Sequence, residues 1–177
     1  GIQNVISAVG SLSGDLSESS KAWQTFETNA STKHSQSEIQ AVKKELQDFA
    51  TATIYSSSDM ASTYSQLDAV GVASAQNLVK AFGGLAAASA DPAQAMKTLS
   101  QQATQMAAKP KVAWEDFKLM LEQSPAGMAA VASEMGMSVQ DLITNIQAGT
   151  VSTTDFFNAV EKAGTSDKFT KMATEYK

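Results

Sequence analysis

The first thirty residues carry apolar side chains at alternating intervals of three and four positions. The series comprises Ile2, Val5, Val9, Leu12, Leu16, Trp23, Phe26 and Ala30, with Ser19 at its one polar position. This spacing is typical of a coiled-coil seam. It predicts a helical arm over residues 1–34 that packs on its own domain or self-associates through the seam. In the second case Trp23 and Phe26 are candidate partner contacts.

A polar stretch ends this pattern, and a second helix is expected over residues 36–55. Its apolar positions, again in 3-4-3 spacing, are Ile39, Val42, Leu46 and Phe49. Ser35 precedes them as an N-cap and Glu38 follows at the third helical position, so that each side chain can bond the backbone amide of the other residue. His34 lies in the polar stretch, where we expect a surface residue.

The middle of the chain continues in helical patterns. Three further helices are predicted there: one that begins after Ser58, one over residues 73–90 and one over residues 92–108. Gly83 and Gly84 fall inside the second, where a glycine pair either bends a helix or admits the backbone of another. Asp91 and Pro92 supply a side-chain cap and a first helical residue for the third.

Residues 110–164 contain one short motif three times. The copies occupy residues 112–117, 137–142 and 151–156. Each has an apolar residue, a small residue, two variable positions, an acid and a large apolar residue. The motif predicts a helix start in which the small residue is the N-cap and the acid lies at the positive end of the helix dipole. The two apolar residues then pack on each other as a hydrophobic staple.

The three motifs assign local roles to particular side chains. The expected caps and staple residues are Val112, Phe117, Ser138, Asp141, Val151, Ser152, Asp155 and Phe156. The second and third copies predict full capping boxes with Asp in place of Glu, whereas Ala113 gives the first copy no capping oxygen. Gly136, Gly149 and Gly164 fit the position after a helix end, where left-handed backbone closes the helix. One more short helix is expected over residues 125–135.

A last helix is predicted over residues 166–176, and no segment shows the strict alternation of a strand. The fold class is therefore expected to be all-α. We predict a heptad-patterned helical arm over 1–34, a compact multi-helix domain of short capped helices over 35–164, and a C-terminal helix or tail over 165–177.

Composition narrows the range of partners. The 13 basic residues are all Lys, and the formal net charge is −5. Without Arg the chain lacks the bidentate group that favours phosphates and base edges, and its lysines are interspersed with acids. Sequence-specific nucleic-acid binding is therefore not expected. No apolar run approaches the roughly 20 residues of a transmembrane helix, so none is expected either. The opening on Gly1 without Met favours a fragment or a processed chain.

Enzymatic and metal-binding chemistry are not expected. The chain has no Cys and one His, His34, which is too few ligands for a structural zinc site. A serine-protease-like triad would have to use the same histidine, and the nucleophile-elbow motif is missing. The glycines at 83–84 lack the lysine of a phosphate-binding loop. We therefore predict no catalytic residue, no metal site and no cofactor.

The aromatic residues concentrate in the region of the repeated motif. Core packing is the simpler interpretation for Phe117, Phe156 and Phe157. Trp114 is expected at the first position of a helix, the place where an aromatic is most exposed. An exposed tryptophan is a frequent anchor in protein interfaces, so Trp114 is a further candidate partner contact.

A series of sequence landmarks extends from residue 58 to residue 164. They are Ser-Asp-Met at 58–60, Leu-Val-Lys-Ala-Phe at 78–82, Lys-Val-Ala-Trp-Glu-Asp-Phe at 111–117, Glu-Gln-Ser-Pro at 122–125 and Gly-Thr-Val-Ser-Thr-Thr-Asp-Phe-Phe at 149–157. Together they resemble the tape-measure domain of bacteriophage tail proteins, and the last landmark is the most characteristic. These landmarks are structural, so the resemblance transfers no catalytic residue.

The resemblance implies a structural role in a phage or prophage tail. Proteins of this family occupy the lumen of the growing tail, set its length, recruit tail-tube subunits and leave ahead of the genome. It implies tail-tube, baseplate or tail-assembly chaperone proteins as partners, and the virion tail lumen, assembled in the host cytoplasm, as the location. The heptad arm would then be the C-terminal end of a long rod. A second hypothesis stays open: a secreted helical binding module, such as an adhesin or toxin-associated domain.

Overall fold

The computed structural model describes residues 21–175. All regular elements in this range are helices, and the one strand-like pairing among the described residues is an isolated antiparallel bridge between Lys111 and Ser152. The prediction of an all-α fold is confirmed. The seam positions from Ile2 to Ser19 lie outside the described residues.

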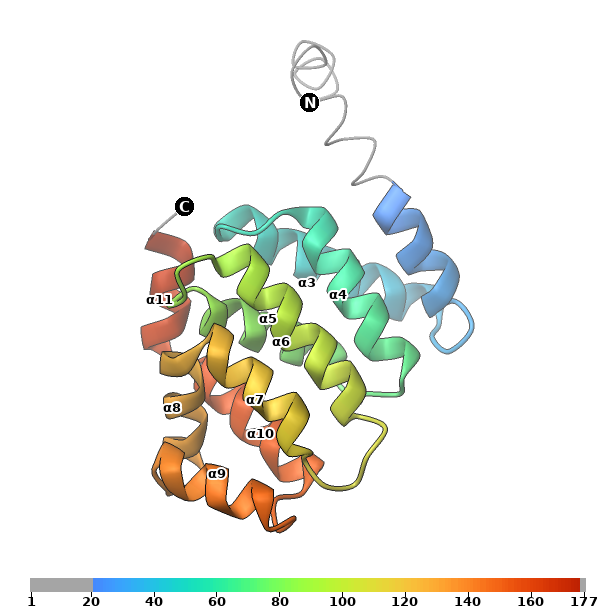
Figure 1. Ribbon diagram of the computed structural model, residues 1–177. Coiled ribbons are helices and arrows are strands. Elements are labelled where there is room, and N and C mark those ends of the chain that lie inside the picture. The colour runs from blue at the N-terminus through green and yellow to red at the C-terminus, as the bar shows by residue number, and fades with distance from the viewer. Residues whose placement is uncertain (1–20, 176–177) are drawn as a thin grey trace.

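The described chain opens with a helical segment over 21–30. It continues through α3 (Gln36–Ala52), α4 (Ser57–Ala69), α5 (Ala75–Ala86), α6 (Pro92–Met106), α7 (Trp114–Gln123), α8 (Pro125–Glu134), α9 (Val139–Gln147), α10 (Thr153–Gly164) and α11 (Asp167–Glu175), as shown in Figure 1. α3 ends before the predicted residue 55 because Tyr55 leaves the helix to bury its ring against α5. α5 begins late because Ser74, with φ of 55°, turns the chain just before it.

α5 lies at the centre of the domain. It packs against α3, α4, α6, α8, α10 and α11. The part from Ala81 to Ala87 is buried on all sides, which is what an all-round apolar helix requires. In Figure 1, α3 and α4 lie at one end of the domain and α7 to α10 at the other, with α5 and α6 between them. One core therefore joins both ends.

The backbones of α5 and α10 meet at two glycines. A Cβ on Gly84 would lie 2.0 Å from the carbonyl oxygen of Gly164, and a Cβ on Gly164 would lie 2.1 Å from that of Ala81. Of the two roles predicted for the glycine pair, admission of a second backbone is therefore the one observed. The expectation of left-handed backbone at Gly164 is wrong, because this residue completes α10 at the crossing. Gly136 and Gly149 do have positive φ, at 75° and 74°.

Gly83, the other member of the pair, makes room for aromatic side chains of α3 and the turn that follows it. The rings of Phe49 and Tyr55 stack with centroids 6.4 Å apart, and the Tyr55 hydroxyl donates to the Gly83 carbonyl. A Cβ on Gly83 would lie 2.9 Å from the Phe49 ring. Burial raises the pKa of Tyr55, so this hydroxyl stays neutral and available as a donor. The contact connects the end of α3 to the centre of the domain.

Residues 21–34 pack on the helices that follow them. Trp23 and Phe26 are only 6% and 1% exposed, and with Ala30 they belong to the same core as α3 and α4. The Phe26 ring lies 5.0 Å from both the Trp23 and the Tyr64 rings. Residues 21–34 are thus part of the domain, because α4 presents aromatic and small side chains that cover the apolar face of the helix over 21–30.

Candidate protein-interaction site

The repeated motifs form helix starts. In the second and third copies the serine hydroxyl accepts the amide of the acid at 3.1 Å, Ser138 from Asp141 and Ser152 from Asp155. Ala113 makes no such bond. The reverse bond, in which the N-cap amide donates to the acid, occurs at 3.3 Å between Ser35 and Glu38. No such bond to Asp141 or Asp155 forms in the described chain. The full boxes expected at these aspartates are therefore only half formed, because Asp is one methylene shorter than Glu.

The first and third motifs lie against each other. The Val112 amide donates to the Val151 carbonyl at 3.0 Å. Thr153 bonds the loop before α7 twice, through its amide at 3.1 Å and its hydroxyl at 2.7 Å. Below these bonds Phe117 and Phe156 meet edge to face, 5.8 Å between ring centroids, and both are fully buried. The staple residues of α7 and α10 thus form one shared cluster and hold the two helix starts together.

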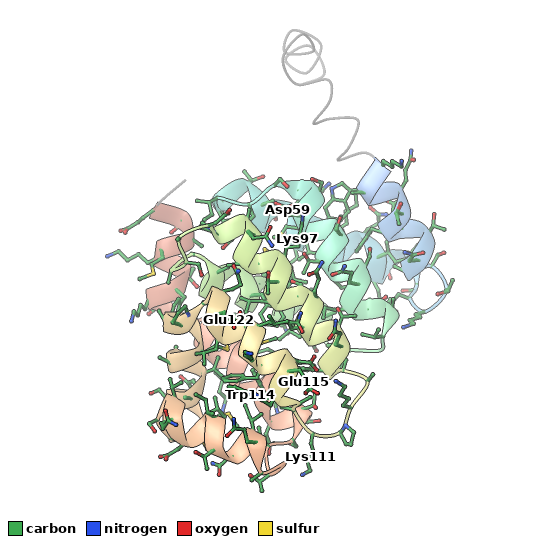
Figure 2. All side chains as sticks on the ribbon, in the orientation of Figure 1. Asp59, Lys97, Lys111, Trp114, Glu115 and Glu122 are labelled. Carbon is green, nitrogen blue, oxygen red and sulfur yellow. The ribbon has the colours of Figure 1, made fainter. Side chains whose placement is uncertain are left out.

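The three candidate partner contacts do not lie together on a surface. Trp23 and Phe26 are buried inside their own domain, and Trp23 also donates from its ring nitrogen to the Ser57 hydroxyl at 2.5 Å. In this fold, therefore, neither side chain is accessible to a partner. Trp114 is half-buried at the start of α7 (Figure 2), with its ring 6.2 Å from that of Phe117. It keeps one exposed side and is the one candidate of the three still open to a partner.

The single histidine connects two elements and is not a free surface residue. His34 Nε2 lies 2.9 Å from the Asp68 carboxylate at the end of α4, and Nδ1 lies 3.5 Å from Glu38. Lys33 donates to the backbone carbonyl of the same aspartate. The Asp68 carboxylate, aided by Glu38, raises the pKa of His34. This cluster holds the turn after the helix over 21–30 against α4.

Replacing His34 with Gln is expected to remove a pH-dependent part of the stability. The folded pKa of His34 is raised, so its contribution is fully present below the unfolded pKa of about 6.5 and is lost as the pH rises through the folded value. The variant should therefore lose more free energy of unfolding at about pH 5.5 than at about pH 8.5, measured by urea unfolding. Lys44→Gln, which removes an exposed pair with Asp48, is the control. A loss from His34→Gln that does not change with pH would contradict this account.

A cleft opens where two loops meet one face of α10. Its volume is about 280 Å³, and its walls are the turn between α4 and α5, the loop between α6 and α7, and α10 itself. Val70 and Phe157 supply apolar surface, Asn158 is exposed, and Lys109 and Glu161 are the charged lining residues. Val70 is one of two large apolar residues whose exposure reaches 41% in the described chain, the other being Leu119 on α7.

The two charged residues of the cleft differ in their partners. Lys109 Nζ bonds the carboxylate of the buried Asp116 at 3.0 Å, so its charge is balanced. Glu161 makes no side-chain hydrogen bond or ion pair with any described residue, and partial burial raises the pKa of its carboxyl group. The cleft therefore presents one uncompensated acid beside an apolar surface.

Two other grooves border α4. They measure about 350 Å³ and 360 Å³ and share Ala22, Ser62 and Gln66 among their lining residues. Asp59 and Lys97, labelled in Figure 2, face the first of them. The lining residues of these grooves are mostly small or polar, and the charged ones include both acids and lysines. The grooves therefore favour no single ligand chemistry.

Residues 21–175 contain no group of three or more His, Asp or Glu side chains placed to hold a metal ion. None of the helices in the same range combines the length and the apolar character needed to cross a bilayer.

Sequence reasoning missed the cleft. Val70, at the end of α4, and Glu161, on α10, are far apart in the sequence. No local sequence pattern indicates that they line the same cleft. The available signal was Val70 next to Gly71, because an apolar residue beside a turn glycine tends to lie at the surface, and Val70 does.

The architecture is that of an all-α domain, built from short capped helices around one central helix. In a comparison with models of known families, the model described as tape measure protein matches residues 14–176. Comparisons with curated proteins and with solved structures gave no match. Because the match covers nearly the whole sequence, the chain belongs to the tape measure protein family.

This membership confirms the resemblance seen in the sequence. The chain has the structural role of a phage tail tape-measure protein, in tail-length determination and tail assembly. No observation favours the alternative of a secreted binding module.

Proposed function

We propose that residues 21–175 form a docking hub for other tail proteins, and that heptad-patterned chain before the hub contributes to the measured length. The observation that carries this proposal is the packing of six helices around α5, with the α5–α10 crossing at Gly84 and Gly164. An extended helix gains about 1.5 Å of length per residue. A domain folded around one central helix gains far less, so it suits recognition better than measurement.

The partners proposed for the hub are tail-tube, baseplate or tail-assembly chaperone proteins, and its proposed location is the tail lumen. Family membership supports the tail context. Surface features support docking: the half-buried Trp114 at the start of α7 and the exposed Val70 beside the α10 cleft. Both are apolar side chains that a partner could cover.

The junction between hub and preceding chain is proposed to be rigid. Trp23 and Phe26 anchor the helix over 21–30 in the core, and Lys43 bonds Glu27 of the same helix at 2.8 Å. This anchoring makes the helix over 21–30 a fixed part of the hub. Because seam positions 23, 26 and 30 are used inside the domain, any self-association would rest on the apolar positions between Ile2 and Leu16.

Deletion of residues 110–164 tests the hub directly. It removes α10, which packs on α5, together with the staple cluster, so the remaining helices lose their shared core and cannot present a docking surface. Electron micrographs of lysates should show no regular tails. The matched control is Leu119→Ser, a change of one exposed side chain, which should leave tails assembled. Infectious tails of full length from the deletion would refute the hub assignment.

A further inference from the structure

We propose that the cleft beside α10 binds a lysine or arginine side chain of a partner tail protein, next to an apolar residue of the same partner segment. This inference rests on the proposed function and names the surface and the chemistry by which the hub docks. The occupant is a protein segment, because an exposed apolar residue, Val70, and an unpaired acid, Glu161, line the same cleft of a chain that belongs to a tail protein family.

The charge of the cleft calls for a cation. Glu161 lies on the α10 wall without a hydrogen bond or ion pair to any described residue, and it is partly desolvated. A partly desolvated carboxylate gains from an opposite charge placed beside it. The nearby Lys109 cannot serve, because its ammonium group is engaged by the buried Asp116. The complementary group must therefore come from outside the described chain.

The apolar wall suits the rest of the same guest. Val70 is 41% exposed and Phe157 is half-buried, and both line the cleft with Glu161. Lys and Arg side chains combine an apolar stem with a charged end. A guest of this type would cover the two apolar residues with its stem and its apolar neighbour while its charge meets Glu161.

An anionic guest is disfavoured by the start of α10. The N-terminus of a helix attracts anions through its free amides, but here the first-turn amides of Thr153 and Asp155 are taken by the Pro110 carbonyl and the Ser152 hydroxyl. The uncompensated carboxylate of Glu161 would also repel an anion. The formal net charge of −5 favours a basic partner segment further.

Site-specific photo-crosslinking in the full-length protein, co-expressed with the tail proteins encoded beside it, tests this inference. A photoreactive residue would replace Thr154, an exposed residue of the cleft lining, or Leu119, which lies outside that lining. Cross-linked peptides are then identified by mass spectrometry. Position 154 should give one partner segment that contains a lysine or arginine beside an apolar residue.

Charge changes provide the matched pair of variants. Glu161→Lys should lower the yield at position 154 by about tenfold or more, because a like charge in the cleft costs at least 1.4 kcal/mol. Glu161→Gln, which keeps the shape, should lower it in the same direction. Glu122→Lys, the same reversal at an exposed acid of α7 (Figure 2), should leave the yield unchanged.

The outcomes separate the cleft from the hub. Cross-links from position 154 that map to a segment without a basic residue, or to a second copy of this chain, would overturn the inference. A yield that ignores Glu161→Lys would overturn it too. Cross-links to tail proteins from position 119 alone would overturn the proposal that the cleft binds a partner but would still support the docking-hub function. An absence of cross-links to any tail protein from both positions would contradict the cleft and the hub together.

Discussion

Gly164→Ala is expected to destabilise the domain by more than about 3 kcal/mol, beyond the usual cost of overpacking. The added methyl group would lie 2.1 Å from the carbonyl oxygen of Ala81 and 2.6 Å from its Cα. These are backbone atoms of a helix packed on all sides, so no side-chain rotation can relieve the overlap. α10 would have to move away from α5 and take the staple cluster with it. Urea unfolding followed by circular dichroism measures the loss.

Gly149→Ala is the matched control for this change. Gly149 has φ of 74°, and nothing lies within 4 Å of a Cβ built on it. The substitution should therefore cost only the strain of left-handed backbone, about 1–2 kcal/mol. If both variants lost the same stability, the close crossing of α5 and α10 would be contradicted.

Phe156→Ala is expected to cost about 3–5 kcal/mol, the usual penalty for removing a large side chain from a core. Phe156 is fully buried between Phe117, 5.8 Å away, and Phe157, 6.4 Å away, measured between ring centroids. The remaining cavity would lie where the starts of α7 and α10 meet, so both helices should lose stability. Denaturant unfolding measures the change.

A neighbouring substitution separates the staple from the cap. Ser152→Ala removes the hydroxyl that accepts the Asp155 amide at 3.1 Å and should cost only about 1 kcal/mol. The two variants should therefore differ severalfold in lost free energy. Negligible losses from both would show that the start of α10 is not folded as described.

The sequence predicted the helix starts well because capping is local chemistry. Ser35 and Ser152 bond amides three residues further along, so their roles can be inferred from spacing alone. The positive φ of Gly136 and Gly149 follows from the same local logic. The half-formed boxes show the limit of this reasoning, because a side-chain length decides whether the second bond forms.

The sequence could not say which surface covers an apolar face. Trp23 and Phe26 have the spacing of a coiled-coil seam, yet both are buried in their own chain, where Phe26 packs against Tyr64 and Trp23 bonds Ser57. A 3-4 spacing predicts that one side of a helix is buried, but it does not indicate which surface covers that side. In the same way the close approach of Gly84 to Gly164 joins residues from distant parts of the chain. Tertiary packing alone brings these partners together, as it does the walls of the α10 cleft.

The central claim is that a heptad-patterned rod sets the tail length and a folded hub follows it. The most direct test is to measure tail length in mutants from which heptads have been deleted. Heptads would be removed as whole units before Lys21, so that the anchored helix over 21–30 and the hub stay intact. The account predicts assembled tails that are shorter by about 10 Å for each seven residues removed, at 1.5 Å of helix per residue. Electron micrographs of purified particles give the length. Tails whose length does not change with the number of heptads removed would contradict it.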